Sequence, residues 1–136
     1  MAKIINIRDS VAEYNDCSIM VDARCEEELA DLVTASGLLR KFRASFKARL
    51  EYLTKHRERA VQHRNWFEDL KYSAGLYAIR MVDVQNIRVL YAFSGQRIYL
   101  LCAFAETERG KRASYQRYIP VAEQRLKEIL EVENHV

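Results

Sequence analysis

Three arginines occur in three short apolar runs between residues 75 and 104, one in each run: Arg80, Arg88 and Arg97. An apolar run does not need a cation in order to fold, so an arginine in each run indicates that these side chains bind a ligand. The guanidinium group is planar, keeps its charge and matches the oxygen atoms of a phosphate. The sequence therefore predicts a surface that meets an anionic ligand.

The three runs read as consecutive antiparallel β-strands, joined by short turns at 83–86 and 94–96. Because alternate side chains of a strand point to opposite faces, the runs divide into two sets. The bulky apolar set predicts the core face: Tyr77, Ile79, Met81, Ile87, Val89, Tyr91, Phe93, Ile98, Leu100, Cys102 and Phe104. The mixed set carries the three arginines with Leu76, Ala78, Val82, Leu90, Ala92, Tyr99, Leu101 and Ala103. We expect this second face to be open, apart from a part covered by the last helix.

Helical patterns flank the predicted strands. Residues 18–23 favour a strand, and Asp22 can cap a helix that ends near Gly37. A second helix follows from apolar residues at three- and four-residue steps: Leu39, Phe42, Phe46, Leu50 and Leu53. Ser114 can cap a last helix, and Pro120 is expected in the first turn of its regular part. The order of strand, two helices, three-stranded meander and helix predicts an α+β fold with helices on one face of an antiparallel sheet.

Length and composition favour one globular domain over residues 1–136, with residues 1–20 as an N-terminal extension. No apolar run is long enough to cross a bilayer, and residues 1–20 lack the design of a signal peptide, so we expect a cytoplasmic protein without membrane contact. Cys17, Cys25 and Cys102 form no CxxC pair and read as free thiols. No cluster has metal-ligand spacing, and we expect no metal and no cofactor.

Charge is distributed unevenly along the chain. Residues 9–31 hold eight acidic residues against Arg24, whereas residues 40–64 hold nine lysines and arginines against Glu51 and Glu58. A cationic region of this kind suits a nucleic-acid partner. The alternative is a solvated helix face.

Several sequence segments resemble the RelE/ParE superfamily of toxins from type II toxin–antitoxin systems, most closely its phage-derived HigB-like branch. The segments are 75–80 (GLYAIR), 86–93 (NIRVLYAF), 101–104 (LCAF) and a later A-x-x-R-L at 122–126. The resemblance covers residues 66–130 and implies a RelE-like fold. The chain departs from the pattern after Phe104, where Glu106 and Glu108 dilute the charge of a loop that is rich in lysine in HigB-like relatives.

The resemblance implies a toxin that cleaves mRNA on the ribosome and is inhibited by a cognate acidic antitoxin. It implies catalytic roles for Arg80, Arg88, Lys111 and Tyr118 and RNA contacts from Lys71, Arg112 and Tyr115. Lys111 and Arg112 remain alternatives for one position, as do Tyr115 and Tyr118 for another. Arg97 and Tyr99, on the same predicted face, are added as RNA contacts.

Cleavage of this kind needs no metal, because the 2′-OH of the RNA attacks the adjacent phosphate. Arginines would stabilise the extra negative charge, and a lysine or tyrosine would move the protons. Two other functions remain open: a ParE-like inhibitor of DNA gyrase that does no chemistry, and an inactive RNA-binding relative. We expect Trp66, Tyr77 and Tyr91 to pack in the interior and His56 and His63 to lie at the surface.

Overall fold

A computed structural model of the chain describes residues 18–71, 75–106 and 111–134. The elements follow in the order β1 (Ile19–Val21), α2 (Ala23–Ser36), α3 (Leu39–His56), a 3-10 helix η1 (Arg57–Gln62), β2 (Phe67–Asp69), β3 (Tyr77–Met81), β4 (Ile87–Ser94), β5 (Arg97–Ala105) and α4 (Lys111–Asn134). The α+β class is confirmed. Within the described residues, none of the helices combines the length and hydropathy that crossing a bilayer requires.

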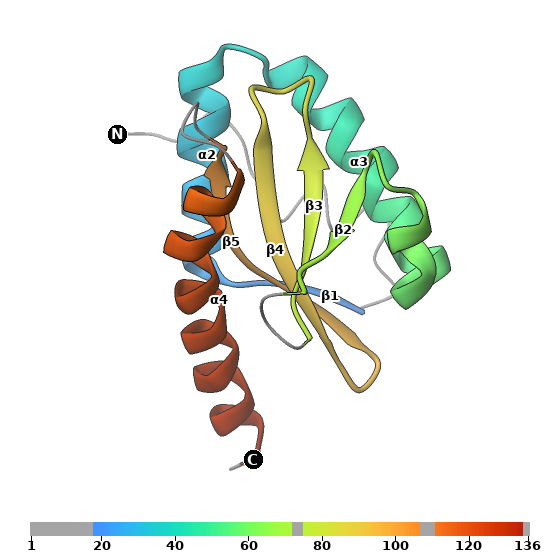
Figure 1. Ribbon diagram of the computed structural model, residues 1–136, viewed down its shortest axis with the longest axis vertical. Helices are drawn as coiled ribbons and strands as arrows, with labels where there is room; N and C mark the ends of the chain where they lie inside the picture. Colours follow the sequence, from blue (N-terminus) through green and yellow to red (C-terminus); the bar gives the residue numbers. More distant parts are fainter. Residues whose placement is uncertain (1–17, 72–74, 107–110, 135–136) are drawn as a thin grey trace.

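The sheet has five strands in the order β1-β5-β4-β3-β2 (Figure 1). The predicted meander is its centre, β3 to β5, and the strand predicted within residues 18–23 is β1. The prediction missed β2 and did not place β1 in the sheet. On one side β1 pairs in parallel with β5, and on the other β2 pairs antiparallel with β3. Strand β2 has three residues, too few to display a clear alternation. Ile19–Val21 therefore belong to the sheet rather than to an extension, and residues 1–17 lie outside the described residues.

Helices cover both faces of the sheet, not one face as the sequence predicted. In Figure 1, α4 lies in front of β5, and α2 lies behind it. The front face is buried because α4 places Tyr115, Ile119 and Ala122 against the sheet. The strand residues that it covers include Leu90 and Leu101. The face that we expected to be largely open is thus a second hydrophobic core, because its apolar residues find a partner in the last helix.

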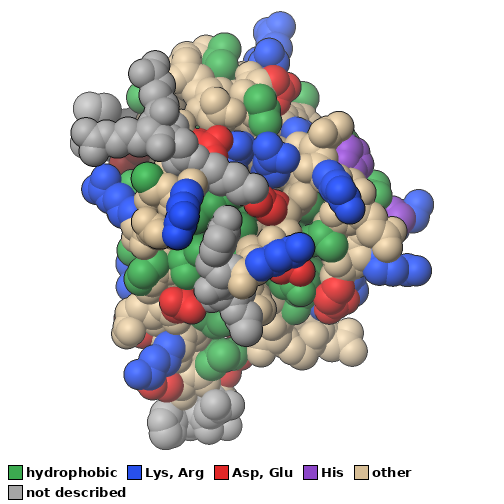
Figure 2. Space-filling model, in the orientation of Figure 1, with side chains coloured by type: hydrophobic (Ala, Val, Ile, Leu, Met, Phe, Trp, Pro, Cys, Tyr) green, Lys and Arg blue, Asp and Glu red, His purple; other side chains and the backbone are tan. Residues whose placement is uncertain are grey.

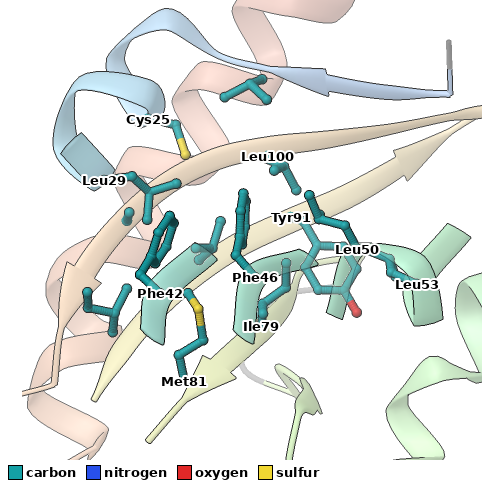
Figure 3. Close-up of a cluster of buried hydrophobic side chains, with 14 of the residues drawn as sticks. Cys25, Leu29, Phe42, Phe46, Leu50, Leu53, Ile79, Met81, Tyr91 and Leu100 are labelled. Carbon is teal, nitrogen blue, oxygen red and sulfur yellow. The ribbon is translucent and has the colours of Figure 1, made fainter. Parts of the chain in front are cut away.

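The first core lies between the sheet and the helices α2 and α3 (Figure 3). It contains the predicted stripe of α3, and Phe42, Phe46, Leu50 and Leu53 are each at most 1% exposed. Trp66 and Tyr77 pack at its edge and Tyr91 is fully buried, which confirms the packing role predicted for all three. His56 and His63 are half-buried against Tyr52, rather than free at the surface.

A β-bulge corrects the predicted faces of β5. Leu90 pairs with Cys102 whereas the next residue, Tyr91, pairs with Leu100, so Leu101 is an extra residue in β5. An extra residue shifts the alternation of all residues beyond it by one. Cys102 and Phe104 therefore join the face of Arg88, and Ala103 joins the first core. Before the bulge the predicted alternation holds.

The helix ends agree with the sequence at α2 and differ at α4. Asp22 caps α2 by accepting a hydrogen bond from the N–H of Arg24 (2.8 Å), and Gly37 ends it at φ 72°. Helix α4 begins at Lys111 rather than at Ser114, which places Pro120 inside the helix instead of in its first turn. A proline there removes one intrahelical hydrogen bond. The helix continues past Pro120 because residues before the proline (Tyr115 and Ile119) and after it (Ala122) are buried in the second core.

Candidate functional site

The candidate site contains a direct cross-strand pair, in which Arg80 on β3 stands opposite Arg88 on β4. Directly opposed residues of adjacent strands share a face, so both arginines lie on the α4 side of the sheet, which we call the arginine face. Their neighbours Ile79, Met81 and Val89 are fully buried in the other core. The prediction that the two arginines project from one face is confirmed.

Arg88 is sealed within the protein. It is 2% exposed, and its Nη2 donates a hydrogen bond to Glu106 Oε2 at 2.8 Å. The backbone of Glu106 is held in turn, because its N–H donates to Asn86 O at 3.0 Å. Nε and Nη1 of Arg88 find no hydrogen-bond acceptor among the described residues. A buried cation with two unused donors is costly for stability, and such costs concentrate at functional sites.

A carboxylate and a phenol lie beside this pair. Glu68 on β2 stands opposite Ala78, two residues from Arg80, and therefore shares the arginine face. Tyr115 of α4 donates its hydroxyl hydrogen bond to Glu68 Oε1 at 2.9 Å. Burial raises the pKa of Tyr115, Glu68 raises it further, and Arg88 acts in the opposite direction. Glu68 was not among the site residues predicted from the sequence, since only the pairing of β2 with β3 brings it to this face.

Arg80 is held by backbone carbonyl groups. Its N–H donates to Trp66 O at 2.7 Å, and its Nη1 donates to Arg64 O at 2.9 Å. Its own carbonyl accepts from Arg49 Nε at 2.7 Å. These contacts fix the start of the side chain and its tip, while the residue stays half-exposed.

A hollow of about 630 Å³ opens between Arg80 and the edge strand β2. It is lined by Arg80, for which the resemblance implied catalysis, by Lys71, for which it implied an RNA contact, and by Arg64. The full lining is Val61, Arg64, Phe67, Glu68, Asp69, Lys71 and Arg80. Basic and acidic side chains are interspersed on the side of the molecule that Figure 2 shows. Three cations around one hollow can follow a phosphate backbone.

The first turns of α4 carry the remaining candidates near the arginines. Arg112 is exposed and lines a smaller hollow of about 240 Å³ beside Tyr115. The ring of Tyr118 stacks on Phe104 with the ring centroids 4.3 Å apart. Of the two alternative tyrosines, Tyr115 is the one bonded to Glu68 on the arginine face. The side chain of Lys111 lies outside the described residues.

Arg97 and Tyr99 lie at the other end of β5. Arg97 pairs with Ser94 across the hairpin turn, whereas Arg88 pairs with Phe104 near the opposite end of the strand. The exposed Arg97 donates to Glu133 Oε1 of α4 at 3.1 Å, and the hydroxyl of Tyr99 donates to the same carboxylate. The structure therefore does not bring these two residues to the Arg80–Arg88 pair; they attach the last turns of α4 to the sheet.

Residues 36–127 match the sequence profile described as "Phage derived protein Gp49-like (DUF891)". The match begins before α3 and includes both arginines, Glu68, Glu106 and Tyr115. The chain belongs to the Gp49-like family. This family is a RelE-like toxin family of toxin–antitoxin systems, which agrees with the resemblance seen in the sequence. The Gp49-like chain matched none of the curated proteins and none of the solved structures with which it was compared.

Because the hydroxyl of Tyr115 is buried, we expect this Gp49-like protein to lose stability at alkaline pH. The folded pKa of Tyr115 lies above its ordinary value of 10.0, so below pH 10 both the folded and the unfolded state keep the proton. Above about pH 10 the unfolded state ionises first, and the free energy of unfolding falls by up to about 1.4 kcal/mol per pH unit for this group. In Tyr115→Phe we expect a shallower fall between about pH 10 and pH 12 than in the wild type, measured by urea unfolding. An equally steep fall in both proteins would contradict the assignment.

Proposed function

We propose that this chain is the toxin of a type II toxin–antitoxin system, of the HigB-like branch, and that it cleaves mRNA as a metal-independent endoribonuclease. The observation that carries the proposal is the direct pairing of Arg80 with Arg88 beside Glu68 and Tyr115. Cations, a carboxylate and a phenol on one face are the groups that RNA cleavage through the 2′-OH requires. We propose that cleavage occurs on the ribosome and that the protein is located in the cytoplasm.

In the proposed reaction the 2′-oxygen forms a bond to the adjacent phosphorus while the bond from phosphorus to the 5′-oxygen breaks. The products are a 2′,3′-cyclic phosphate and a free 5′-OH. The carboxylate of Glu68 would accept the 2′ proton, and Tyr115, kept protonated by its raised pKa, would supply a proton to the leaving 5′-oxygen. Arg80 and Arg88 would stabilise the charge that gathers on the phosphate oxygens. Lys71 and Arg112 would contact the RNA on either side.

The ion pair of Arg88 sets a condition on this reaction. Glu106 occupies the guanidinium group in the described structure, so a substrate phosphate would have to take the place of that carboxylate. Arg88 Nε and Nη1 are available for such an exchange, because neither has an acceptor among the described residues. A phosphate offers more acceptor oxygens than one carboxylate and would satisfy more of the donors.

The same ion pair favours a second candidate function. An arginine that is 2% exposed and paired at 2.8 Å can also be purely structural. A toxin-like chain without catalysis would then act by binding, either as a ParE-like inhibitor of DNA gyrase or as an inactive RNA-binding relative. Both alternatives predict that the intact chain leaves mRNA uncut.

Inducible expression in bacteria, followed by mapping of mRNA ends, tests the proposal. We expect growth arrest with new 5′-OH ends at positions set by the reading frame, because cleavage occurs on translated mRNA. Addition of ribosomes to the purified chain and an mRNA should then reproduce the same ends. DNA damage without mRNA cleavage would support the gyrase inhibitor instead. The proposed partner is a small acidic antitoxin, and its co-expression should restore growth.

A further inference from the structure

A third hollow lies beside α3, the helix that covers the face opposite α4. It has a volume of about 680 Å³ and runs between α3 and the end of β3; we call it the α3–β3 groove. Its lining consists of Lys41, Ala44, Ser45, Ala48, Arg49, Asn65, Trp66, Arg80, Val82 and Asp83. The proposed RNA site makes no use of most of these residues.

The floor of the groove contains a buried cation without a carboxylate partner. Arg49 is 7% exposed, and its guanidinium donates to two backbone carbonyls, Arg80 O at 2.7 Å and Ser45 O at 3.2 Å. No acidic side chain lies within ion-pair distance of Arg49 in the described part of the chain. Burial lowers the pKa of Arg49, which reflects the cost of keeping this charge away from water.

A second buried polar group in the groove also has no partner. The side chain of Ser45 is buried, and its Oγ has no hydrogen bond among the described residues. Arg49 presents a positive charge to whatever enters the groove, whereas the Oγ of Ser45 is enclosed beside it. An incoming carboxylate could accept from Arg49, which would remove part of the cost of burying this charge.

The walls of the groove suit a polypeptide. Ala44 and Ala48 lie one turn apart on α3, and such small side chains allow another backbone to come close. Val82 at the rim is 53% exposed, which is unusual for a large apolar residue and offers a contact for an apolar side chain. Residues 39–50 of α3 contain no acidic residue, and the exposed Lys41 extends the positive charge along the groove.

The occupied aromatic ring of the groove makes RNA a poor occupant. Trp66 is the one aromatic ring in the lining, and it already packs against the guanidinium of Arg49 at 4.6 Å and the ring of His63 at 4.3 Å. A base would need an open ring for stacking.

We infer that the α3–β3 groove is the docking site for an acidic segment of a protein partner. The segment would place a carboxylate at Arg49 and Lys41 and an apolar side chain at Val82. The inference rests on the proposed function only in taking this partner to be the antitoxin. It also locates the antitoxin on the face of α3, away from the Arg88–Glu106 pair but in a groove that shares Arg80 with the proposed RNA site.

The probe is the purified protein encoded by the open reading frame beside the gene for this chain, titrated against the full chain. Lys41→Glu reverses a charge at the groove, and Ala48→Arg fills it. Lys127→Glu is the matched control, because it makes the same charge change at an exposed position of α4. We expect both groove variants to raise the Kd about tenfold or more, and the control to change it by less than about twofold. Thermal unfolding of each variant checks that the fold is kept.

Wild-type affinity in both groove variants would overturn the inference, and so would a lack of binding by the wild-type chain. A short single-stranded RNA serves as the second probe. We expect Lys41→Glu to bind it as the wild type does, and a tenfold loss would overturn the inference by making the groove an RNA site. Growth arrest by the chain alone separates the two proposals, since groove variants should still arrest growth. If the wild-type chain arrests growth but the groove variants bind the partner with unchanged affinity, the docking site alone is rejected. If the groove variants lose affinity but the wild-type chain does not arrest growth, the nuclease function alone is rejected.

Discussion

Replacing Arg80 by alanine is expected to lower the rate of RNA cleavage by about 10²-fold or more, because one preorganised donor to a developing phosphate charge is worth that much. The loss should occur in kcat rather than in KM, since the charge develops in the transition state. Arg80 is half-exposed and fills no core volume, so the free energy of unfolding should fall by about 1 kcal/mol at most. Cleavage of a short mRNA by the purified variant, with and without ribosomes, measures the effect.

Arg97→Ala is the matched control for this experiment. It removes an arginine from β5, two strands away from β3 in the sheet, that is 52% exposed and paired with Glu133. We expect its cleavage rate to stay within about twofold of the wild type, because a surface ion pair contributes little. Equal activity of Arg80→Ala and Arg97→Ala would reject the catalytic role of Arg80.

Arg88→Ala is a poorer first test than the sequence suggested. From the sequence alone, its replacement should leave the fold intact. In the structure it would leave Glu106, itself mostly buried, without its cation, and it would open space at a residue that is 2% exposed. A loss of activity in that variant would combine a chemical effect with a structural one.

A large loss of stability is expected from Arg125→Ala. Arg125 of α4 donates both Nη atoms to the carboxylate of Glu28 on α2, each at 2.8 Å, and Nη1 also donates to Leu101 O at 2.8 Å. Glu28 Oε1 in turn accepts from the N–H of Ala103 at 3.1 Å. The pairing of β1 with β5 ends at Val21. Beyond that point Arg125 and Glu28 provide hydrogen-bond partners for two backbone groups of β5, Leu101 O and the N–H of Ala103.

We expect Arg125→Ala to lower the free energy of unfolding by about 2–3 kcal/mol, because a bidentate pair and the partners of two backbone groups are lost together. Glu28→Ala should cost a similar amount, and the double variant should cost clearly less than the sum. Arg24→Ala is the control. It breaks ion pairs with Asp22 and Glu128 at a side chain that is 49% exposed, and should cost less than about 1 kcal/mol. Urea unfolding of the four variants measures these values, and additive losses at 28 and 125 would show that the two residues do not act as one unit.

Local patterns determined most of the secondary structure in advance. The apolar spacing of α3, the cap at Asp22 and the break at Gly37 all depend on neighbours within one or two helical turns. The same holds for the alternation of β3 and β4, which placed Arg80 and Arg88 on one face. Such features follow from the sequence because the contacts that fix them are close in the chain.

Tertiary structure decided the features that depend on distant residues. The bulge at Leu101 and the strand β2 exist only through pairing with neighbouring strands, and they decide where Phe104 and Glu68 lie. The covering of the arginine face by α4 likewise depends on a helix that begins at Lys111.

The candidate site shows the same division. Its arginines could be chosen from the sequence, because a cation within an apolar strand is visible in the pattern itself. The partners of those arginines could not, since Glu106 meets Arg88 across 18 residues and Tyr115 meets Glu68 across 47. Hydrogen bonds between side chains carry no periodic signal along the chain, and their free energy depends on burial that only the packed layers create. The types of the reactive groups can thus be predicted from the sequence, whereas their pairing and exposure depend on the fold.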